Sequence, residues 1–159
     1  CGELPESMKR LMKMDFVVNR MEGIKKQLFS LSDCDMTTAR EFIDYLIDFV
    51  LEHAVPVSVP LVTLCDDIKR YTYSCLMHKR CANCGRKADM HHFDAIGMGR
   101  DREEVYQIGM LVIPLCRKCH GEAHDRGKSW ITDDLHLEPI PLTAEIGKKY
   151  GLTRKNLGN

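Results

Sequence analysis

The residues best able to bind a metal ion or move a proton lie in one stretch, residues 81–124. It holds two cysteine pairs of the form C-x2-C, with four histidines interleaved between and after them. Thiolates at this spacing can both reach one tetrahedral Zn²⁺, and two such pairs complete its shell. The sequence therefore predicts a structural zinc site made by Cys81, Cys84, Cys116 and Cys119.

The histidines need a separate explanation, because four cysteines already fill a zinc shell. His91 and His92 are adjacent, and in an extended strand adjacent side chains point to opposite faces, so they cannot both bind one ion. On a helix, His120 and His124 lie one turn apart on the same face. One of the adjacent pair can join them around a divalent ion with open positions, while the other remains a neutral imidazole near pH 7.

That arrangement suits metal-assisted hydrolysis. The ion polarises a phosphoryl oxygen and stabilises the leaving oxygen, and the histidine that does not bind metal deprotonates water. The alternative without catalysis is that one histidine replaces a cysteine in the zinc shell and the others are surface residues.

Short segments must position these side chains. Lys87–Phe93 is bounded by turn signals and Leu111–Leu115 is a β-branched run of strand length, so together they predict a hairpin. A short helix is expected at residues 119–124. The connection between the strands, Asp94–Gly109, is long and polar, which is typical of a functional or mobile loop. Its Arg100 and Arg102 are suited to DNA phosphate contacts.

The flanking regions read as helical. Residues 6–31 fit one helix, or two broken near Gly23, and residues 36–53 form the clearest amphipathic helix. Another helix is expected to start at Pro60 and run through Leu76. A short element near residues 130–137 and a helix over 143–150 follow the metal region. We therefore expect a helical domain at 1–79, a metal domain at 80–127 and an extension at 128–159 that packs on the core.

Charge and composition limit the function. Lysine plus arginine equal aspartate plus glutamate at 23 each, so a polyanion site must be local. No apolar run approaches the roughly 20 residues of a membrane span. The absence of a signal peptide and the C-x2-C pairs indicate a reducing, cytoplasmic setting. Cys1, where a translated chain has Met, indicates a fragment of a longer protein.

The ordered pattern resembles a known family. Strand, loop, strand and helix, with H-H at the start and L-C-x2-C-H-x3-H at the end, look like the ββα-metal core of HNH endonucleases pinned by a CxxC…CxxC zinc. The run H-H-F-D-A-I-G-M-G-R-D-R and the helix E-F-I-D-Y-L-I-D-F further resemble HNH nucleases of bacteriophages of Gram-positive hosts. These are similar to phage Orf-type recombination proteins with a C-terminal HNH module. The specific likeness covers residues 29–140, and the motif covers 81–126.

The resemblance implies a role for each histidine. His91, His120 and His124 become the ligands of a second divalent cation, which is Mg, Mn, Ni or Zn, and His92 becomes the general base. There is one departure, because Leu111 occupies the position of the middle Asn of the HNH pattern. In the family that Asn is thought to orient the base, and Gln107 and Asp94 are the candidates to substitute for it here.

The sequence thus predicts an α+β protein, with an α-helical N-terminal part followed by a zinc-stabilised ββα-metal domain. It is expected to be a metal-dependent DNA endonuclease that serves phage recombination, replication or packaging in the bacterial cytoplasm. The rival hypothesis is a non-catalytic recombination mediator that binds single-stranded DNA or a host replication protein. A zinc-ribbon transcription factor would leave the four histidines without a purpose.

Overall fold

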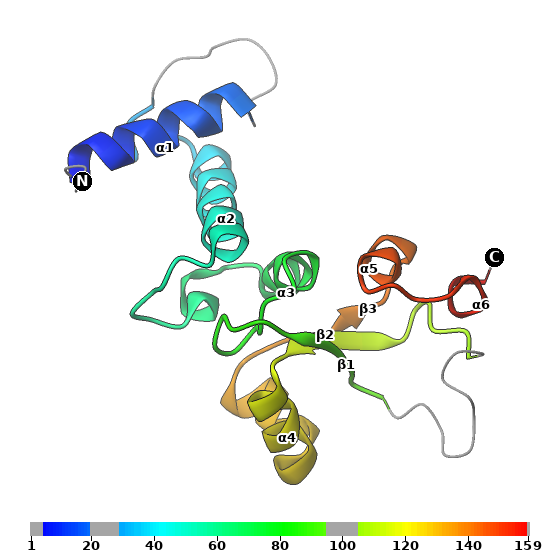
Figure 1. Cartoon of the computed structure of the whole chain (residues 1–159). Coiled ribbons are helices and arrows are strands. Elements are labelled where there is room, and N and C mark those ends of the chain that lie inside the picture. The colour runs from blue at the N-terminus through cyan, green and yellow to red at the C-terminus, as the bar shows by residue number, and fades with distance from the viewer. Residues whose placement is uncertain (1–4, 20–28, 95–104, 159) are drawn as a thin grey trace. The chain divides into compact units, whose positions relative to one another are not determined.

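The structure is a computed structural model that describes residues 5–19, 29–94 and 105–158 (Figure 1). The chain divides into two compact units, Cys1–Phe49 and Val50–Asn159. Within the described ranges, no helix is long and apolar enough to span a bilayer. The second unit contains every described residue of the predicted metal sites.

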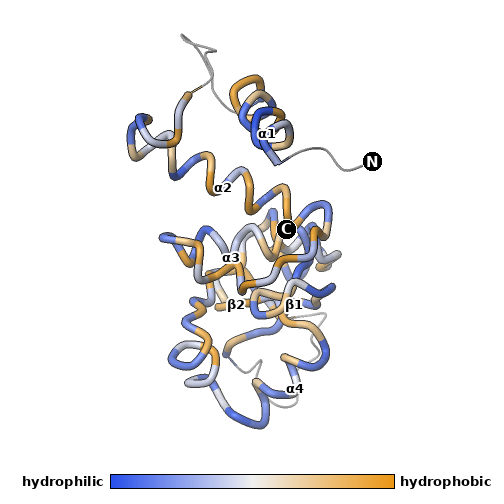
Figure 2. The backbone as a smooth tube through the Cα atoms, turned by 90° about the vertical axis from the view of Figure 1, so that its left-hand side faces the viewer, coloured by the Kyte–Doolittle hydropathy of each residue, from blue (hydrophilic) through white to orange (hydrophobic). Residues whose placement is uncertain are grey.

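The first unit is built by α1 (Pro5–Asn19) and most of α2 (Met36–His53). Polar and apolar residues alternate along both helices (Figure 2), as in helices that bury one face. Phe16 packs against Phe29, Phe42 and Tyr45, with ring centroids 5.8, 5.2 and 5.6 Å away. The α2 helix matches the amphipathic segment predicted at 36–53, whereas the part of the predicted helix around Gly23 lies outside the described residues.

The second unit contains a three-stranded antiparallel sheet in the order β1-β2-β3. The predicted hairpin is confirmed, since β1 (Asp89–His92) pairs with β2 (Leu111–Leu115) and His91 lies opposite Ile113. The third strand, β3 (Ile140–Pro141), was not expected from the sequence. After β2 comes α4 (Arg117–Arg126), so the strand, strand and helix of the predicted core follow in order.

The single helix predicted from Pro60 to Leu76 is wrong. The chain forms a 3₁₀ turn, η1 (Leu61–Leu64), and then a separate helix, α3 (Ile68–Met77). Extended backbone at Cys65 (φ −106°, ψ 130°) separates them, and the Asp67 side chain caps α3 by accepting from the backbone N–H of Arg70. A capping carboxylate satisfies an N–H group that lacks a partner in the first helical turn, so the new helix begins there.

The C-terminal extension adds three more short elements to this unit. A π-helical turn, η2 (Trp130–Asp134), lies in the region where a short element was predicted, and α5 (Ala144–Lys149) matches the helix expected over 143–150. The last element, α6 (Arg154–Leu157), was not expected. Thr153 and Asn156 form its capping box, which explains how so short a helix can be specified.

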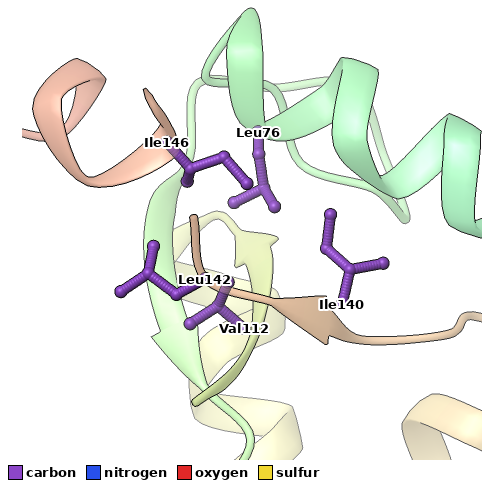
Figure 3. Packing of buried hydrophobic residues seen from close by; sticks show 5 residues of the cluster. All are labelled: Leu76, Val112, Ile140, Leu142 and Ile146. Atoms are coloured by element: carbon purple, nitrogen blue, oxygen red, sulfur yellow. The ribbon is translucent and has the colours of Figure 1, made fainter. Parts of the chain in front are cut away.

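The core of the second unit joins segments that are far apart in sequence. Its cluster contains Leu76 of α3, Val112 of β2, Ile140 of β3, and Leu142 and Ile146 (Figure 3). As a result α3 and α5 lie on one side of the strands, and α4 lies on the other (Figure 1). Because α3 packs here, it belongs to the same compact unit as the strands. The predicted α+β class is confirmed.

Candidate metal centres

The four predicted zinc ligands come together at one end of the sheet. Cys81 and Cys84 belong to a tight turn closed by hydrogen bonds from Cys81 N to Arg86 O (2.7 Å) and from Gly85 N to Cys81 O (2.8 Å). Gly85 has φ +68°, a conformation that costs glycine little. Cys116 follows β2 at the N-cap of α4, and Cys119 lies in the first turn of that helix.

The geometry of these cysteines fits Zn²⁺. Their four Sγ atoms all lie within 4.8 Å of one another, and Cys84 Sγ is 3.6 Å from Cys116 Sγ and 3.9 Å from Cys119 Sγ. A tetrahedral zinc with Zn–S bonds of about 2.3 Å separates its sulfur ligands by about 3.8 Å. The cluster can therefore hold one structural zinc.

The electrostatics of the thiols favour a bound cation. Burial raises the pKa of Cys81, and burial likewise raises the pKa of Cys119 to about 11. Such thiols ionise at neutral pH only beside a positive charge, which Zn²⁺ supplies. Burial also opposes ionisation of Cys84, but a hydrogen bond from Arg86 Nε to Cys84 Sγ (3.3 Å) helps to lower the pKa of this thiol to about 7.

Two neighbours of the cysteines were missed by sequence reasoning. Arg86 donates to Cys84 Sγ, and Asn83 Nδ2 donates to Cys119 Sγ at 3.5 Å. N–H groups directed at sulfur stabilise negative charge on a thiolate and fix its orientation. Both residues lie within or next to the first C-x2-C turn, so their position beside two thiolates was the available signal.

A second cluster forms where β1 faces α4. The rings of His91, His120 and His124 lie together, with centroids 4.4 Å apart for His91 and His120, and 4.8 Å apart for His120 and His124. One ring nitrogen from each residue lies within 4.8 Å of the others. His91 and His120 are half-buried, and His124 is exposed. The three residues expected to converge are thus close enough to share one ion.

The protonation state of His91 suits metal binding. Burial lowers the pKa of His91 to about 4, and the nearby His120, His124 and His92 oppose its positive charge further. A neutral imidazole is the form that binds a metal. Three imidazoles leave positions open on a divalent ion, and these can take a water or a substrate oxygen.

His92 is not part of this cluster, as expected for the residue next to His91 on a strand. Its Nε2 atom lies 3.0 Å from Oε1 of Gln107, whose side chain is only 3% exposed. The other candidate to support the base, Asp94, is exposed and forms an ion pair with Lys128 (2.6 Å). Leu111 is the first residue of β2, and its carbonyl accepts from Phe93 N (2.8 Å). Arg100 and Arg102 lie outside the described residues.

Comparison with known proteins identifies a relationship over nearly the whole chain. The model of a family described as "Putative HNHc nuclease" matches residues 1–152. This range includes the first unit, both candidate metal centres, η2, β3 and α5. Neither a curated protein nor a solved structure matches the chain.

Proposed function

The chain belongs to the HNHc nuclease family, and we propose that it is a metal-dependent DNA endonuclease that hydrolyses phosphodiester bonds. The observation that carries this proposal is the convergence of His91, His120 and His124, with His92 next to His91 on β1 but outside the cluster. Three neutral ligands and a separate imidazole base are what metal-assisted hydrolysis requires.

In this proposal, His91, His120 and His124 hold a divalent cation, which is Mg, Mn, Ni or Zn. When bound, the cation supplies positive charge that polarises the phosphoryl oxygen and stabilises the leaving oxygen. His92 removes the proton from the attacking water. Since Nε2 of His92 already faces Gln107 Oε1, the atom that accepts the proton is Nδ1.

The zinc centre acts as a scaffold. Cys116 and Cys119 fix the start of α4, and His120 is the next residue along that helix. The turn that contains Cys81 and Cys84 is joined to β2 by the hydrogen bond from Ala82 N to Pro114 O (3.0 Å). Zinc therefore holds α4 against the hairpin, which sets the distance between His91 and the two helical histidines.

We further propose that Arg100 and Arg102 contact DNA phosphates without reading bases, and that the enzyme serves phage DNA recombination, replication or packaging in the bacterial cytoplasm. Phage or host replication and recombination proteins are the expected partners. This context rests on the resemblance of the H-H-F-D-A-I-G-M-G-R-D-R and L-C-R-K-C-H-G-E-A-H segments to phage nucleases.

The test is nicking of supercoiled plasmid with Mg, Mn, Ni and Zn in turn. The parent chain should cleave with at least one metal. His92→Ala should keep both metals and bind DNA, yet cleave about 10² to 10⁴ times more slowly, which is the usual contribution of a positioned base. His53→Ala, which changes an exposed histidine outside the cluster, is the control and should cleave like the parent.

One observation favours a second candidate function. Leu111 occupies the position of the family's middle Asn, as expected for a core that has lost catalysis. In that case the protein is a recombination mediator that binds single-stranded DNA or a replication protein on a zinc-stabilised scaffold. Failure of all four metals to support cleavage, or full activity of His92→Ala, would favour this function.

A further inference from the structure

We propose that Gln107 is the positioning residue for His92, and that the C-terminal residues 153–158 hold Gln107 in place. This inference rests on the proposed nuclease function and deepens it. It assigns a role to α6, which lies beyond the family-matched residues 1–152. It also answers how the base is oriented when Leu111 replaces the middle Asn.

The contact between the two side chains fixes the hydrogen on the ring. Gln107 Oε1 lies 3.0 Å from His92 Nε2, and a carbonyl oxygen can only accept, so Nε2 carries the hydrogen. The opposite ring nitrogen, Nδ1, then keeps its lone pair. An imidazole that must take a proton from water needs this tautomer and a fixed ring plane.

Gln107 is unusual for a loop residue because it is almost fully buried, at 3% exposure. A buried amide needs polar partners, and its Oε1 has one in His92 Nε2. Its backbone N–H donates to Asn156 O (2.9 Å), and its carbonyl accepts from Met110 N (3.0 Å). The main chain of Gln107 is thus held on both sides.

The α6 helix clamps this segment through Asn156. That residue is only 2% exposed, and its Nδ2 donates to Val105 O (2.8 Å) while its Oδ1 accepts from Thr153 N (3.1 Å) in the capping box. The side-chain amide of Asn156 therefore caps α6 and also binds the backbone of Val105, two residues before Gln107. At the end of α6, an added Cβ at Gly158 would lie 2.7 Å from Tyr106 Cε2, so the helix end lies directly against the neighbouring residue.

The other end of the segment is tied to the strand region. Gly109 N donates to Leu142 O (2.9 Å), and Leu142 N donates to Met110 O (2.8 Å). Leu142 belongs to the apolar core cluster with Val112, the β2 residue opposite His92. The support of the base thus runs from the core and from α6 to Gln107, and then to the imidazole.

The experiment compares two substitutions of nearly equal size in the full chain. Gln107→Met keeps the volume but removes the acceptor, whereas Gln107→Glu keeps an acceptor oxygen. Gln107→Met should lower kcat about 10- to 100-fold, as other outer partners of site histidines do, with KM and bound metal unchanged. Gln107→Glu should restore most of kcat, which a purely packing role of Gln107 would not predict.

A second readout does not depend on activity. Nitrogen NMR of the histidine-labelled chain, with the ring neutral, should show His92 with hydrogen on Nε2 in the parent and in Gln107→Glu, and a mixture of tautomers in Gln107→Met. Asn156→Asp should keep the helix cap but lose the donor to Val105 O, and it should lower kcat less than Gln107→Met does. Arg154→Ala, an exposed change in the same helix, is the control.

The outcomes separate this inference from the proposed function. Unchanged kcat in Gln107→Met, or the same His92 tautomer in all variants, would overturn the positioning role while leaving the nuclease intact. If the parent chain cleaves with none of the metals, the nuclease proposal fails, and the tautomer measurement alone then decides whether Gln107 orients His92.

Discussion

The two candidate metal centres share their structural elements but differ in chemistry. The hairpin region and α4 supply both, and Cys119 and His120 are neighbours that face different clusters. The cysteine cluster is mostly buried and offers four thiols, which is the number needed to close a tetrahedral shell around one ion. The histidine cluster offers three imidazoles among the described residues, and one of them, His124, is exposed.

This difference teaches which site depends on the other. Zinc bound by the four cysteines would fix the first turn of α4 and so set the position of His120. His120 and His124 lie further along a helix that the zinc would already hold, so an ion bound to the histidines is not needed to form that helix. We therefore expect an asymmetric dependence, in which loss of zinc removes both sites and loss of the second ion removes only one.

The largest effect is expected from disrupting the cysteine cluster. Cys84→Ser removes one thiolate from the shell, and structural zinc contributes on the order of 10 kcal/mol to the folding of small zinc domains. The variant should lose the folded second unit, and with it binding of the other ion. Thermal melting followed by circular dichroism, together with metal content, measures this.

The matched control for that variant is Cys65→Ser. Cys65 lies outside the cluster, and its thiol donates to Leu61 O (3.1 Å), a contact that a serine hydroxyl can keep. It should melt close to the parent. If Cys84→Ser, stripped of metal, also melts like the parent, the structural-zinc assignment is wrong.

Disrupting the histidine cluster should lower activity but leave the protein folded. His91→Ala and His124→Ala each leave two imidazoles, so the second ion should be lost at ordinary concentrations while zinc stays bound. Excess divalent cation should restore part of the cleavage by these variants, but should not restore His92→Ala. Metal analysis and plasmid nicking test this, and loss of zinc from His124→Ala would contradict the asymmetry.

A smaller effect is expected on DNA binding, which should depend on the arginines between β1 and β2 and not on a lysine beside the cysteine cluster. Arg100→Ala with Arg102→Ala should weaken binding to all sequences alike and reduce the slope of log affinity against log salt by about 2, one for each phosphate contact. Lys87→Ala, an exposed change beside the zinc turn, should leave that slope unchanged. Equal slopes for both variants would remove the two arginines from the interface.

Much of this architecture could be predicted because its signals are local. The hairpin, α4 and the convergence of His91 with the two helical histidines follow from strand alternation and from i, i+4 helical spacing. The break before α3 also had a local signal, since Asp67 is a good N-cap residue. That signal competed with an apolar pattern that continued from Leu64 to Ile68.

The remaining features are set by contacts between distant segments. β3 has two residues and one of them is proline, so nothing in its own sequence predicts a strand without β2 beside it. The contact between Gln107 and His92 depends on Asn156, which is far away along the chain. Sequence reasoning could name Gln107 as a substitute for the missing Asn, but only the packing of α6 places it.

The smallest effect is expected at Leu111, where the sequence departs from the HNH pattern. Leu111 begins β2, is half-buried and pairs with Pro141 of β3. Leu111→Asn restores the family residue but places an amide on an apolar strand, which should cost about 1 kcal/mol of stability. Because Gln107 Oε1 already faces His92 Nε2, a second amide has little left to orient, and cleavage should be unchanged or modestly faster. Leu111→Ala separates the loss of apolar contact from any gain due to the amide.

In the Gln107→Met background, the same Leu111→Asn change should raise cleavage by a larger factor than in the parent. Equal factors in both backgrounds would mean that the two amides do not serve the same histidine.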